Sequence, residues 1–419
     1  MTPSIVITGI GAACHRAMDT GALWDRLAAA APGWKPDAPF DTAPYRCRMN
    51  AITDPAEALA ALAARAPWLA AAIPPGAPRS LPVGLAAAHE ALTMAGLDPD
   101  EIRVGLSIGT TSGSGMDDFA AGIGPDRASP AAEGIAAAAS SDAVLAGLAS
   151  ALGLTGPRAQ ISNACTSAAA AIIHGAGMLM TGRAAAVLAG GVDHAREADF
   201  AGFNAIRAMS PQALRAFDRD RDGMMIGDGA AFLLLEREAD AIARGAAILA
   251  RLDGFGIATD AFHATRPQPD GMTRAVTAAL RLAAGGADLG AVRDSVGYVN
   301  CHGTGTPAND ATEAEALAQV FPDPATRPVL NSTKTTTGHL LGTAAAIEAV
   351  ITVMILIRGT VPQMAGSETA DPAIAFPLAL GREVALPGLD RALSTTLGFG
   401  GVNACISLSR AAAPAGLPQ

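Results

Sequence analysis

Three short segments of the chain carry side chains that could together perform acyl chemistry. Cys165 lies in Ile-Ser-Asn-Ala-Cys-Thr-Ser, and His302 lies in Cys-His-Gly-Thr-Gly-Thr. Lys334 and His339 share the segment Lys-Thr-Thr-Thr-Gly-His. A cysteine offers a nucleophile, two imidazoles offer hydrogen-bond donors, and a lysine offers a cation. A site with these groups could hold an acyl thioester and stabilise a carbanion equivalent beside it.

The elements around these residues determine where their side chains point. A predicted strand over 158–162 runs into an alanine-rich helix, which puts Cys165 at a helix start. Helix N-termini favour a thiolate over a thiol. His302 ends a predicted strand over 296–301 and is followed by glycines, so we expect it to project into a cleft. Cys301 should face the opposite side of that strand and serve packing.

A glycine-rich loop over 397–403, Leu-Gly-Phe-Gly-Gly-Val-Asn, is a further candidate. Its backbone must bend sharply, and its N–H groups could contribute to an oxyanion hole. Phe399 is the bulky side chain among these glycines, and we expect it to be able to swing.

Metal and dinucleotide sites are not indicated. Zinc ligands usually cluster in sequence, and Cys165, His302 and His339 do not, so we expect no metal. The segment Gly9-Ile10-Gly11 resembles half of a dinucleotide fingerprint, but Cys14 occupies the third glycine position. The five cysteines are an odd number and form no Cys-x-x-Cys pair, which favours reduced thiols over disulfides.

Composition narrows the class of protein. The net charge of −10 argues against nucleic acid as the main partner. Of the 29 basic residues only Lys35 and Lys334 are lysines, so a lysine within a motif suggests a specific need for an ammonium group. The most apolar run, 349–357, is too short to span a bilayer, and the N-terminal segment lacks signal-peptide features. We therefore expect a cytoplasmic protein without membrane insertion.

Strand and helix patterns alternate along the chain, which predicts an α/β architecture. The pattern restarts near residue 246, so we predict two related halves, 1–246 with Cys165 and 247–412 with the histidines, and a tail over 413–419. No residue-level repeat between the halves is evident. The segment 209–225 carries alternating charges and is predicted to be a loop with a functional role, with a solvated turn as the alternative.

In these residues and in the segments around them, the chain resembles the elongating β-ketoacyl-acyl-carrier-protein synthases of the thiolase superfamily over nearly its whole length. The resemblance rests on the segments VITGIGA, NACTSAAA, FDRDRDGMMIGDGAAFLLLE, CHGTGTPAND, KTTTGHLLGTAAAIEA and LGFGGVNA. The Cys-His-His set distinguishes the chain from thiolases, which use a second cysteine. It also distinguishes it from chain-initiating synthases, which have asparagine in the last position.

The resemblance implies a duplicated αβαβα five-layer fold and a homodimer, with a heterodimer with a related subunit left open. It implies that Cys165 accepts an acyl group from the phosphopantetheine arm of an acyl-carrier protein, and that no other cofactor is needed. His302 and His339 would support decarboxylation of malonyl-carrier protein and its condensation with the acyl group. Lys334 and Glu348 match the supporting lysine and glutamate of the family.

Further roles also follow from the resemblance alone. The N–H groups of Cys165 and Phe399 match the oxyanion hole, Phe399 would gate the acyl pocket, and Ile108 would limit its depth. The residues implied to contact the substrate or its pantetheine arm are Thr304, Thr306, Ile108, Phe203 and Gly400. Those implied to dock the carrier protein are Arg127, Arg207 and Arg65.

The resemblance leaves the pathway open. Leu397 replaces a usual phenylalanine and Val402 a usual threonine, so fatty-acid elongation and specialised polyketide or polyene assembly are both compatible. A noncatalytic subunit of the chain-length-factor type is one alternative, against which the retention of Cys165 argues. A thiolase-like acyl-CoA transferase is another, and it would require Cys405 to be a second reactive thiol.

Overall fold

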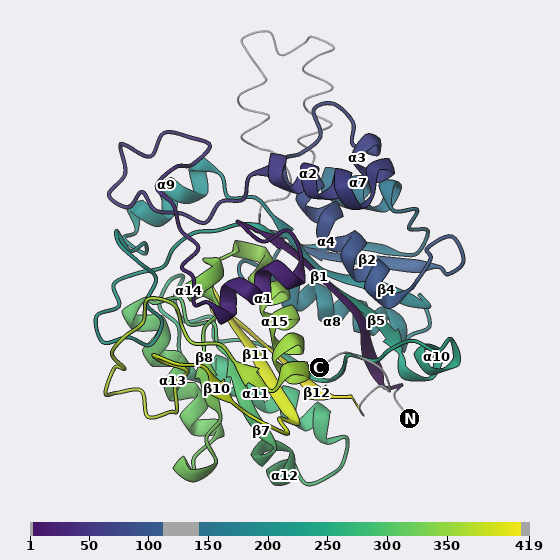
Figure 1. Ribbon diagram of the computed structural model, residues 1–419. Helices are drawn as coiled ribbons and strands as arrows, with labels where there is room; N and C mark the ends of the chain where they lie inside the picture. The colour runs from purple at the N-terminus through teal and green to yellow at the C-terminus, as the bar shows by residue number, and fades with distance from the viewer. Residues whose placement is uncertain (1–2, 112–141, 412–419) are drawn as a thin grey trace.

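A computed structural model describes residues 3–111 and 142–411 (Figure 1). Its strands are β1 (Ile5–Cys14), β2 (Val104–Gly109), β3 (Arg158–Ile161), β4 (Ala186–Asp193), β5 (Gly229–Arg237), β6 (Ala250–Thr259), β7 (Val296–Asn300), β8 (Val329–Asn331), β9 (Thr360–Val361), β10 (Val384–Ala385), β11 (Arg391–Gly398) and β12 (Val402–Arg410). Its helices are α1 (Thr20–Ala28), α2 (Pro55–Arg65), α3 (Pro67–Ala72), α4 (Ser80–Ala95), α7 (Ala143–Ala151), α8 (Ser167–Met180), α9 (Glu197–Ala205), α10 (Glu238–Ala243), α11 (Pro269–Ala284), α12 (Leu289–Asp294), α13 (Pro307–Val320), α14 (Lys334–Thr337) and α15 (Ala344–Arg358).

The order of strands in the large sheet has an internal symmetry. The order is β3-β2-β4-β5-β1-β6-β12-β11-β7-β8, and the two halves of this order match when β6 stands for β1, β7 for β2 and β8 for β3. Strand β2 is parallel to β3 and β4, and β7 is likewise parallel to β8 and β11. The halves meet where β1 pairs antiparallel with β6. The duplicated architecture expected from the resemblance is thus confirmed, while the boundary at residue 246 stays a prediction.

A residue-level repeat accompanies this symmetry. Gly9 and Gly11 are the fifth and seventh residues of β1, and Gly254 and Gly256 hold the same places in β6. A Cβ on Gly9 would lie 2.0 Å from a backbone oxygen of α4, and one on Gly254 would lie 2.1 Å from a backbone oxygen of α11. This repeat was not detected from the sequence alone. The apparent half of a dinucleotide fingerprint is explained by close packing of a helix on a strand.

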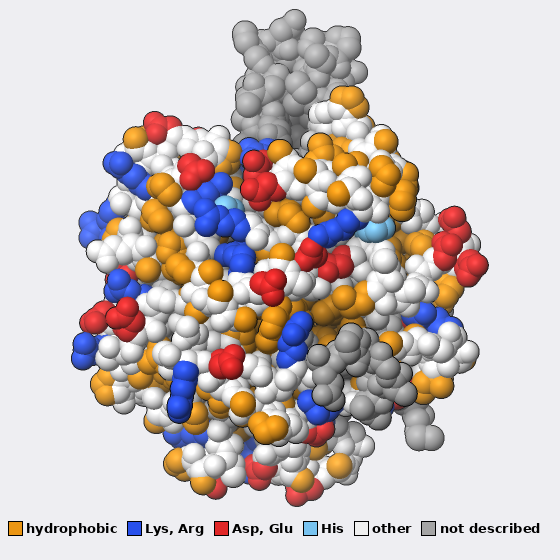
Figure 2. All heavy atoms as spheres, in the orientation of Figure 1, with side chains coloured by type: hydrophobic (Ala, Val, Ile, Leu, Met, Phe, Trp, Pro, Cys, Tyr) orange, Lys and Arg blue, Asp and Glu red, His pale blue; other side chains and the backbone are white. Residues whose placement is uncertain are grey.

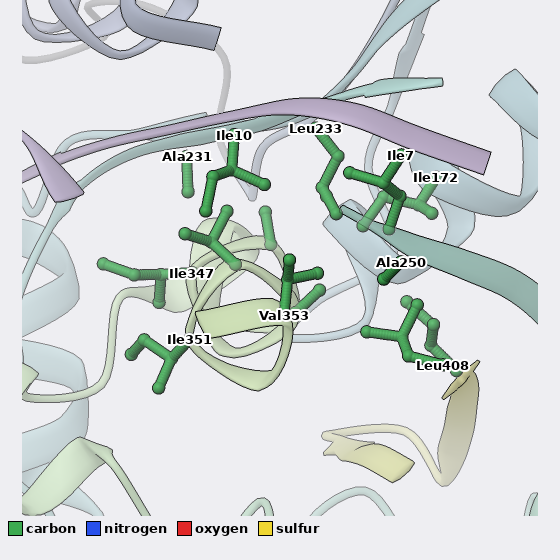
Figure 3. Close-up of a cluster of buried hydrophobic side chains, with 14 of the residues drawn as sticks. Ile7, Ile10, Ile172, Ala231, Leu233, Ala250, Ile347, Ile351, Val353 and Leu408 are labelled. Carbon is green, nitrogen blue, oxygen red and sulfur yellow. The ribbon is translucent and has the colours of Figure 1, made fainter. Parts of the chain in front are cut away.

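Helices α8 and α15 form the central layer, between the two halves of the sheet. Helix α8 packs on β2 and β4, α15 packs on β11 and β5, and the two helices contact each other. Figure 3 shows α15, with Ile347, Ile351 and Val353, lying below β1, which carries Ile7 and Ile10, and all five residues belong to one buried cluster. The outer faces are covered by α4 on one half and by α11 on the other.

The apolar helical stretch extends beyond the most apolar run, 349–357. Residues 341–358 are long and apolar enough to cross a membrane by length and composition, but 89% of this window is buried inside the protein. This burial accounts for its apolar character, because a helix surrounded by protein needs no polar face.

Three short helices, α9, α12 and α14, were not predicted, because each is too short to show a clear helical period. The segment 209–225 forms no regular helix or strand, as expected for a loop, and the alternative of a solvated turn is wrong. Leu214, Phe217 and Asp218 are buried in it, and Asp218 accepts hydrogen bonds from two backbone N–H groups near residue 368.

The equivalent glycines should respond alike to substitution. We expect Gly9→Ala and Gly254→Ala each to lower the free energy of unfolding by about 1–3 kcal/mol, because the added methyl group meets backbone. Gly177→Ala in α8 is the matched control, since a Cβ there meets nothing within 4 Å. Urea unfolding measures all three, and an unchanged midpoint in either strand variant would contradict the close packing.

Candidate active site

Cys165 lies in a tight connection between β3 and α8. Ala164 directly before it has a φ of 48°, a left-handed conformation that is uncommon for a residue with a side chain. Helix α8 begins at Ser167, with Thr166 as its N-cap. Cys165 is only 8% exposed. The strained turn thus directs the thiol into the protein rather than toward solvent.

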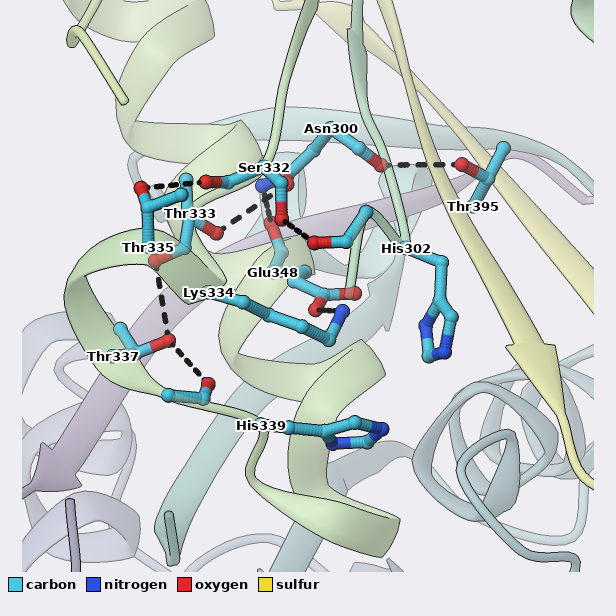
Figure 4. Close-up of polar contacts among 12 residues, drawn as sticks. Asn300, His302, Ser332, Thr333, Lys334, Thr335, Thr337, His339, Glu348 and Thr395 are labelled. Atoms are coloured by element: carbon cyan, nitrogen blue, oxygen red, sulfur yellow. Dashed lines mark hydrogen bonds and ion pairs between the residues drawn. The ribbon is translucent and has the colours of Figure 1, made fainter. Parts of the chain in front are cut away.

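The two histidines reach Cys165 from the other half of the fold. His302 lies two residues after the end of β7, and His339 lies two residues after the end of α14. One ligand-type atom of each of the three side chains lies within 4.8 Å of the others, and all three residues are buried. The imidazole rings lie 5.2 Å apart and nearly perpendicular, at 88°. Figure 4 shows both rings directed toward the same space.

Burial dominates the ionisation of Cys165. It raises the pKa of the thiol to about 11, against the opposing effects of the Lys334 charge and of a hydrogen bond from the Phe399 N–H to the sulfur. The expectation that the helix start favours a thiolate was therefore incomplete, because it omitted the loss of hydration. The sulfur needs a proton acceptor, or the nearby cation, in order to react.

The imidazoles are held in their neutral form. Burial, and secondly the charge of Lys334, keeps the pKa of His302 and that of His339 well below the usual value. The Leu341 N–H donates to His339 Nδ1 at 3.0 Å. In a neutral ring the proton must then be on Nε2, so His339 offers a hydrogen-bond donor to the cavity.

Lys334 forms a buried ion pair with Glu348. Its Nζ contacts Glu348 Oε1, and both side chains are 1% exposed (Figure 4). Lys334 comes from α14 and Glu348 from α15, which fixes these helices against each other. Burial raises the pKa of Glu348 to about 7, while Lys334 lowers it. The pair was predicted from the resemblance, and the structure brings it beside the three converging side chains.

A second carboxylate that the sequence reasoning missed positions His302. Glu313 in α13 accepts hydrogen bonds from the backbone N–H of His302 at 2.7 Å and of Gly303 at 2.8 Å. Asp310, one helical turn earlier, accepts from the Gly305 N–H at 3.1 Å. The signal was present as two acidic residues three positions apart, directly after the glycine loop.

The converging side chains open into a narrow cavity of about 70 Å³, room for only a few water molecules. Thr304, Thr306 and Phe203, which were predicted to contact the substrate, line it together with Phe399. The hydroxyl oxygens of Thr304 and Thr306 lie 3.0 Å apart. Phe399 is 43% exposed, and its ring lies 5.9 Å from that of Phe203. Side chains must therefore move before a long acyl chain can enter.

Other predicted site residues lie elsewhere. Ile108 is buried in β2 and is not among the described residues that line the cavity, and neither is Gly400, between two residues that do line it. Arg207 is exposed and directly precedes the lining residue Ala208. Arg65 forms an ion pair with Asp19.

Arg127 lies outside the described residues. On the face shown in Figure 2, basic and acidic side chains are interspersed. The proposed docking roles of the three arginines stay predictions.

The structure overturns the reasoning by which a metal was excluded, because residues distant in sequence do converge at one point. A better physical reason comes from the hydrogen bond at His339 Nδ1, which places a proton rather than a lone pair on Nε2. Lys334 adds a nearby positive charge, which opposes a second cation. That the site binds no metal stays a prediction.

The other cysteines near the motifs are placed in the core. Cys301 and Cys405 are fully buried, and burial raises the pKa of each thiol well above its usual value. Neither is among the described residues that line the cavity. A second reactive thiol, as thiolase chemistry requires, is therefore not supplied by these two residues.

Comparisons with known proteins agree with this geometry. Residues 2–241 match the family described as beta-ketoacyl synthase, N-terminal domain, and residues 249–368 match its C-terminal domain. The chain is 36% identical to the 3-oxoacyl-[acyl-carrier-protein] synthase 2 of Vibrio cholerae over 346 residues, which cover 78% of this chain and 81% of that protein. It is 35% identical to nodulation protein E of Rhizobium meliloti over 336 residues, covering 77% and 80% of the two chains. Among solved structures, the ishigamide ketosynthase/chain length factor superposes with a TM-score of 0.86 at 26% identity, covering 98% of this chain and 100% of the other.

The two lysines allow a direct test of the buried cation. We expect Lys334→Met to slow alkylation of Cys165 by iodoacetamide at pH 8, because loss of the positive charge raises the thiol pKa and so lowers the thiolate fraction. Each unit of upward shift costs about tenfold in rate. Lys35→Met is the matched control, since Lys35 pairs with Asp37 near the surface. The rates are measured by mass spectrometry of the Cys165 peptide. Equal alkylation rates in the two variants would show that Lys334 does not lower the pKa of the Cys165 thiol.

Proposed function

The chain belongs to the β-ketoacyl synthase family, and on that basis we propose that it joins an acyl group held on Cys165 to malonyl-acyl-carrier protein by decarboxylative Claisen condensation. The observation that carries this proposal is the convergence of one thiol and two neutral imidazoles within 4.8 Å, beside a buried ammonium group. Each group in this set has a separate task in the reaction: the thiol holds the acyl group, the imidazoles donate hydrogen bonds, and the ammonium group favours the thiolate.

In the first half-reaction the Cys165 sulfur attacks the thioester carbonyl of the acyl-carrier protein. The carbon–sulfur bond to pantetheine breaks, and the leaving thiolate takes the proton that Cys165 gives up. The Phe399 N–H, already directed at the sulfur, is placed to donate to the oxyanion of the tetrahedral intermediate. The charge of Lys334 favours the thiolate that attacks.

In the second half-reaction the bond between the malonyl carboxylate and C2 breaks, and carbon dioxide leaves. The electron pair passes into a thioester enolate, whose oxygen accepts hydrogen bonds from the His339 Nε2–H and from an N–H of His302. Neutral imidazoles suit this role, because a positively charged ring would give up its proton to the enolate carbon instead. The enolate carbon then attacks the acyl carbonyl, and the Cys165 thiolate is expelled and reprotonated.

The partner we propose is an acyl-carrier protein with its phosphopantetheine arm. The name of the Vibrio cholerae relative includes such a carrier. In this chain, Thr304 and Thr306 line the cavity and offer hydroxyl groups to the amides of the arm. We also propose that the enzyme works in the cytoplasm, which the five free cysteines support.

We further propose a homodimer formed through the edge of the large sheet. Strand β3 ends the sheet, pairs only with β2 among the described strands, and leads directly to Cys165. Its four residues are partly or fully exposed, so an edge of unpaired N–H and C=O groups is available. A heterodimer with a related subunit would use the same edge, and the mass of the purified particle distinguishes the two.

The pathway has two candidates. Similarity to a 3-oxoacyl-carrier-protein synthase favours fatty-acid elongation, whereas similarity to nodulation protein E and to a ketosynthase/chain length factor favours a specialised pathway. A chain-length-factor subunit without catalysis is disfavoured, because both Cys165 and its converging histidines are present. The mass of the acyl group on Cys165 after expression with the neighbouring genes would separate the pathways.

Substitution of the histidines should separate acylation from condensation. We expect His302→Ala and His339→Ala to lower the condensation rate by about 10²–10³, the usual effect of removing one donor to an oxyanion. Both variants should still accept an acyl group on Cys165, seen as the added mass of one acyl chain. Cys165→Ala is the control that loses both steps, and full condensation activity in either histidine variant would refute the assigned role.

A further inference from the structure

The cavity that contains Cys165 has an exposed side formed by residues 263–267. His263, Ala264, Thr265, Arg266 and Pro267 all line it. Residues 261–266 are exposed, whereas the thiol and both catalytic imidazoles are buried. The lining therefore runs from a buried reactive end to this exposed segment, which forms the entrance.

The entrance segment is held in place by its own hydrogen bonds. The Asp260 carboxylate accepts from the Gln268 N–H at 2.9 Å, which closes the loop at its two ends. The Gly400 N–H donates to the Ala264 carbonyl at 2.9 Å, and the Asp260 N–H donates to the Gly401 carbonyl at 2.9 Å. The segment is thus tied to the loop that carries Phe399, and its backbone has a defined position relative to the cavity.

Arg266 is the only charged side chain among the described residues that line this cavity. Its guanidinium group forms no ion pair with the described carboxylates, whereas arginines such as Arg244 and Arg391 are paired at 2.6–2.7 Å. The chain as a whole has a net charge of −10. An anion that approaches the entrance therefore meets the unpaired positive charge of Arg266, although the chain as a whole is acidic.

We propose that Arg266 binds the phosphate of the phosphopantetheine arm while the thiol end of the arm reaches Cys165. This inference rests on the proposed function, because it takes the arm as the substrate carrier. The phosphate is the charged group of the arm, and it cannot enter a narrow cavity whose described lining is otherwise uncharged. A guanidinium group binds phosphate through paired hydrogen bonds and is suited to hold it at the entrance. Arg266 is accordingly a specificity-determining residue that distinguishes phosphorylated from unphosphorylated pantetheine thioesters.

The test compares two small thioesters that differ by the phosphate alone. Acylation of Cys165 is measured with acyl-pantetheine and with acyl-phosphopantetheine, in the unmodified enzyme, in Arg266→Gln and in Arg266→Lys. We expect the unmodified enzyme to have a KM about tenfold lower for the phosphorylated ester, the equivalent of one charge-assisted contact. In Arg266→Gln the two KM values should converge, and Arg266→Lys should restore part of the difference. Arg281→Gln, on the exposed surface of α11, is the control and should retain the full difference.

Each outcome decides a separate claim. Equal KM values for the two esters in the unmodified enzyme, or an undiminished difference in Arg266→Gln, would overturn the role of Arg266. Failure of every ester to acylate Cys165 would instead overturn the proposed function. Acyl-coenzyme A and acyl-carrier protein, tested in the same way, identify the natural source of the phosphate: the one whose KM rises more in Arg266→Gln depends more on this contact.

Discussion

The buried ion pair between Lys334 and Glu348 is the interaction on which the chemistry of this site depends. An ammonium group at 1% exposure is tolerated only with a partner, because an unpaired buried charge costs several kcal/mol. Glu348 supplies that partner from α15, the helix that the two halves of the sheet enclose. With the pair in place, a single positive charge acts on three neighbours: it lowers the pKa of the Cys165 thiol and disfavours protonation of His302 and His339. The same charge thus acts on the proposed nucleophile and on both proposed hydrogen-bond donors.

The duplicated topology explains how distant segments reach this charge. Cys165 follows β3, and Lys334 follows β8, which occupies the equivalent place in the second half. His302 follows β7 and Phe399 follows β11, each at an end of a strand in that half. Strand ends of the two halves therefore meet around the central helices. The first half contributes the cysteine, and the second half contributes the histidines, the lysine and Phe399. The glycines of β1 and β6 preserve the close helix packing that this arrangement requires.

Much of this could be predicted from the sequence, and the failures have physical causes. The periodic pattern located the long strands and helices, and motif resemblance identified Cys165, His302, His339 and Lys334. Spacing along the chain was a poor argument against a metal site, because folding brings together segments more than 130 residues apart, as between Cys165 and His302. The positive charge at a helix start predicted too low a pKa for the Cys165 thiol, because the burial that raises this pKa is a property of the tertiary structure. The role of Glu313 was missed, because two acidic residues three positions apart do not by themselves show that they bind the backbone N–H groups of the preceding loop.

The central claim is that carbon–carbon bond formation is driven by loss of carbon dioxide at a site where one cysteine holds the acyl chain. Malonyl-carrier protein labelled with ¹³C in its free carboxyl group tests this most directly, with labelled carbon dioxide and β-ketoacyl product counted in the same reaction. The account predicts one labelled carbon dioxide for each product, with product formation abolished when Cys165 is replaced by alanine. Product formed from an unactivated acetyl thioester without release of carbon dioxide would contradict it and favour thiolase-like acyl transfer.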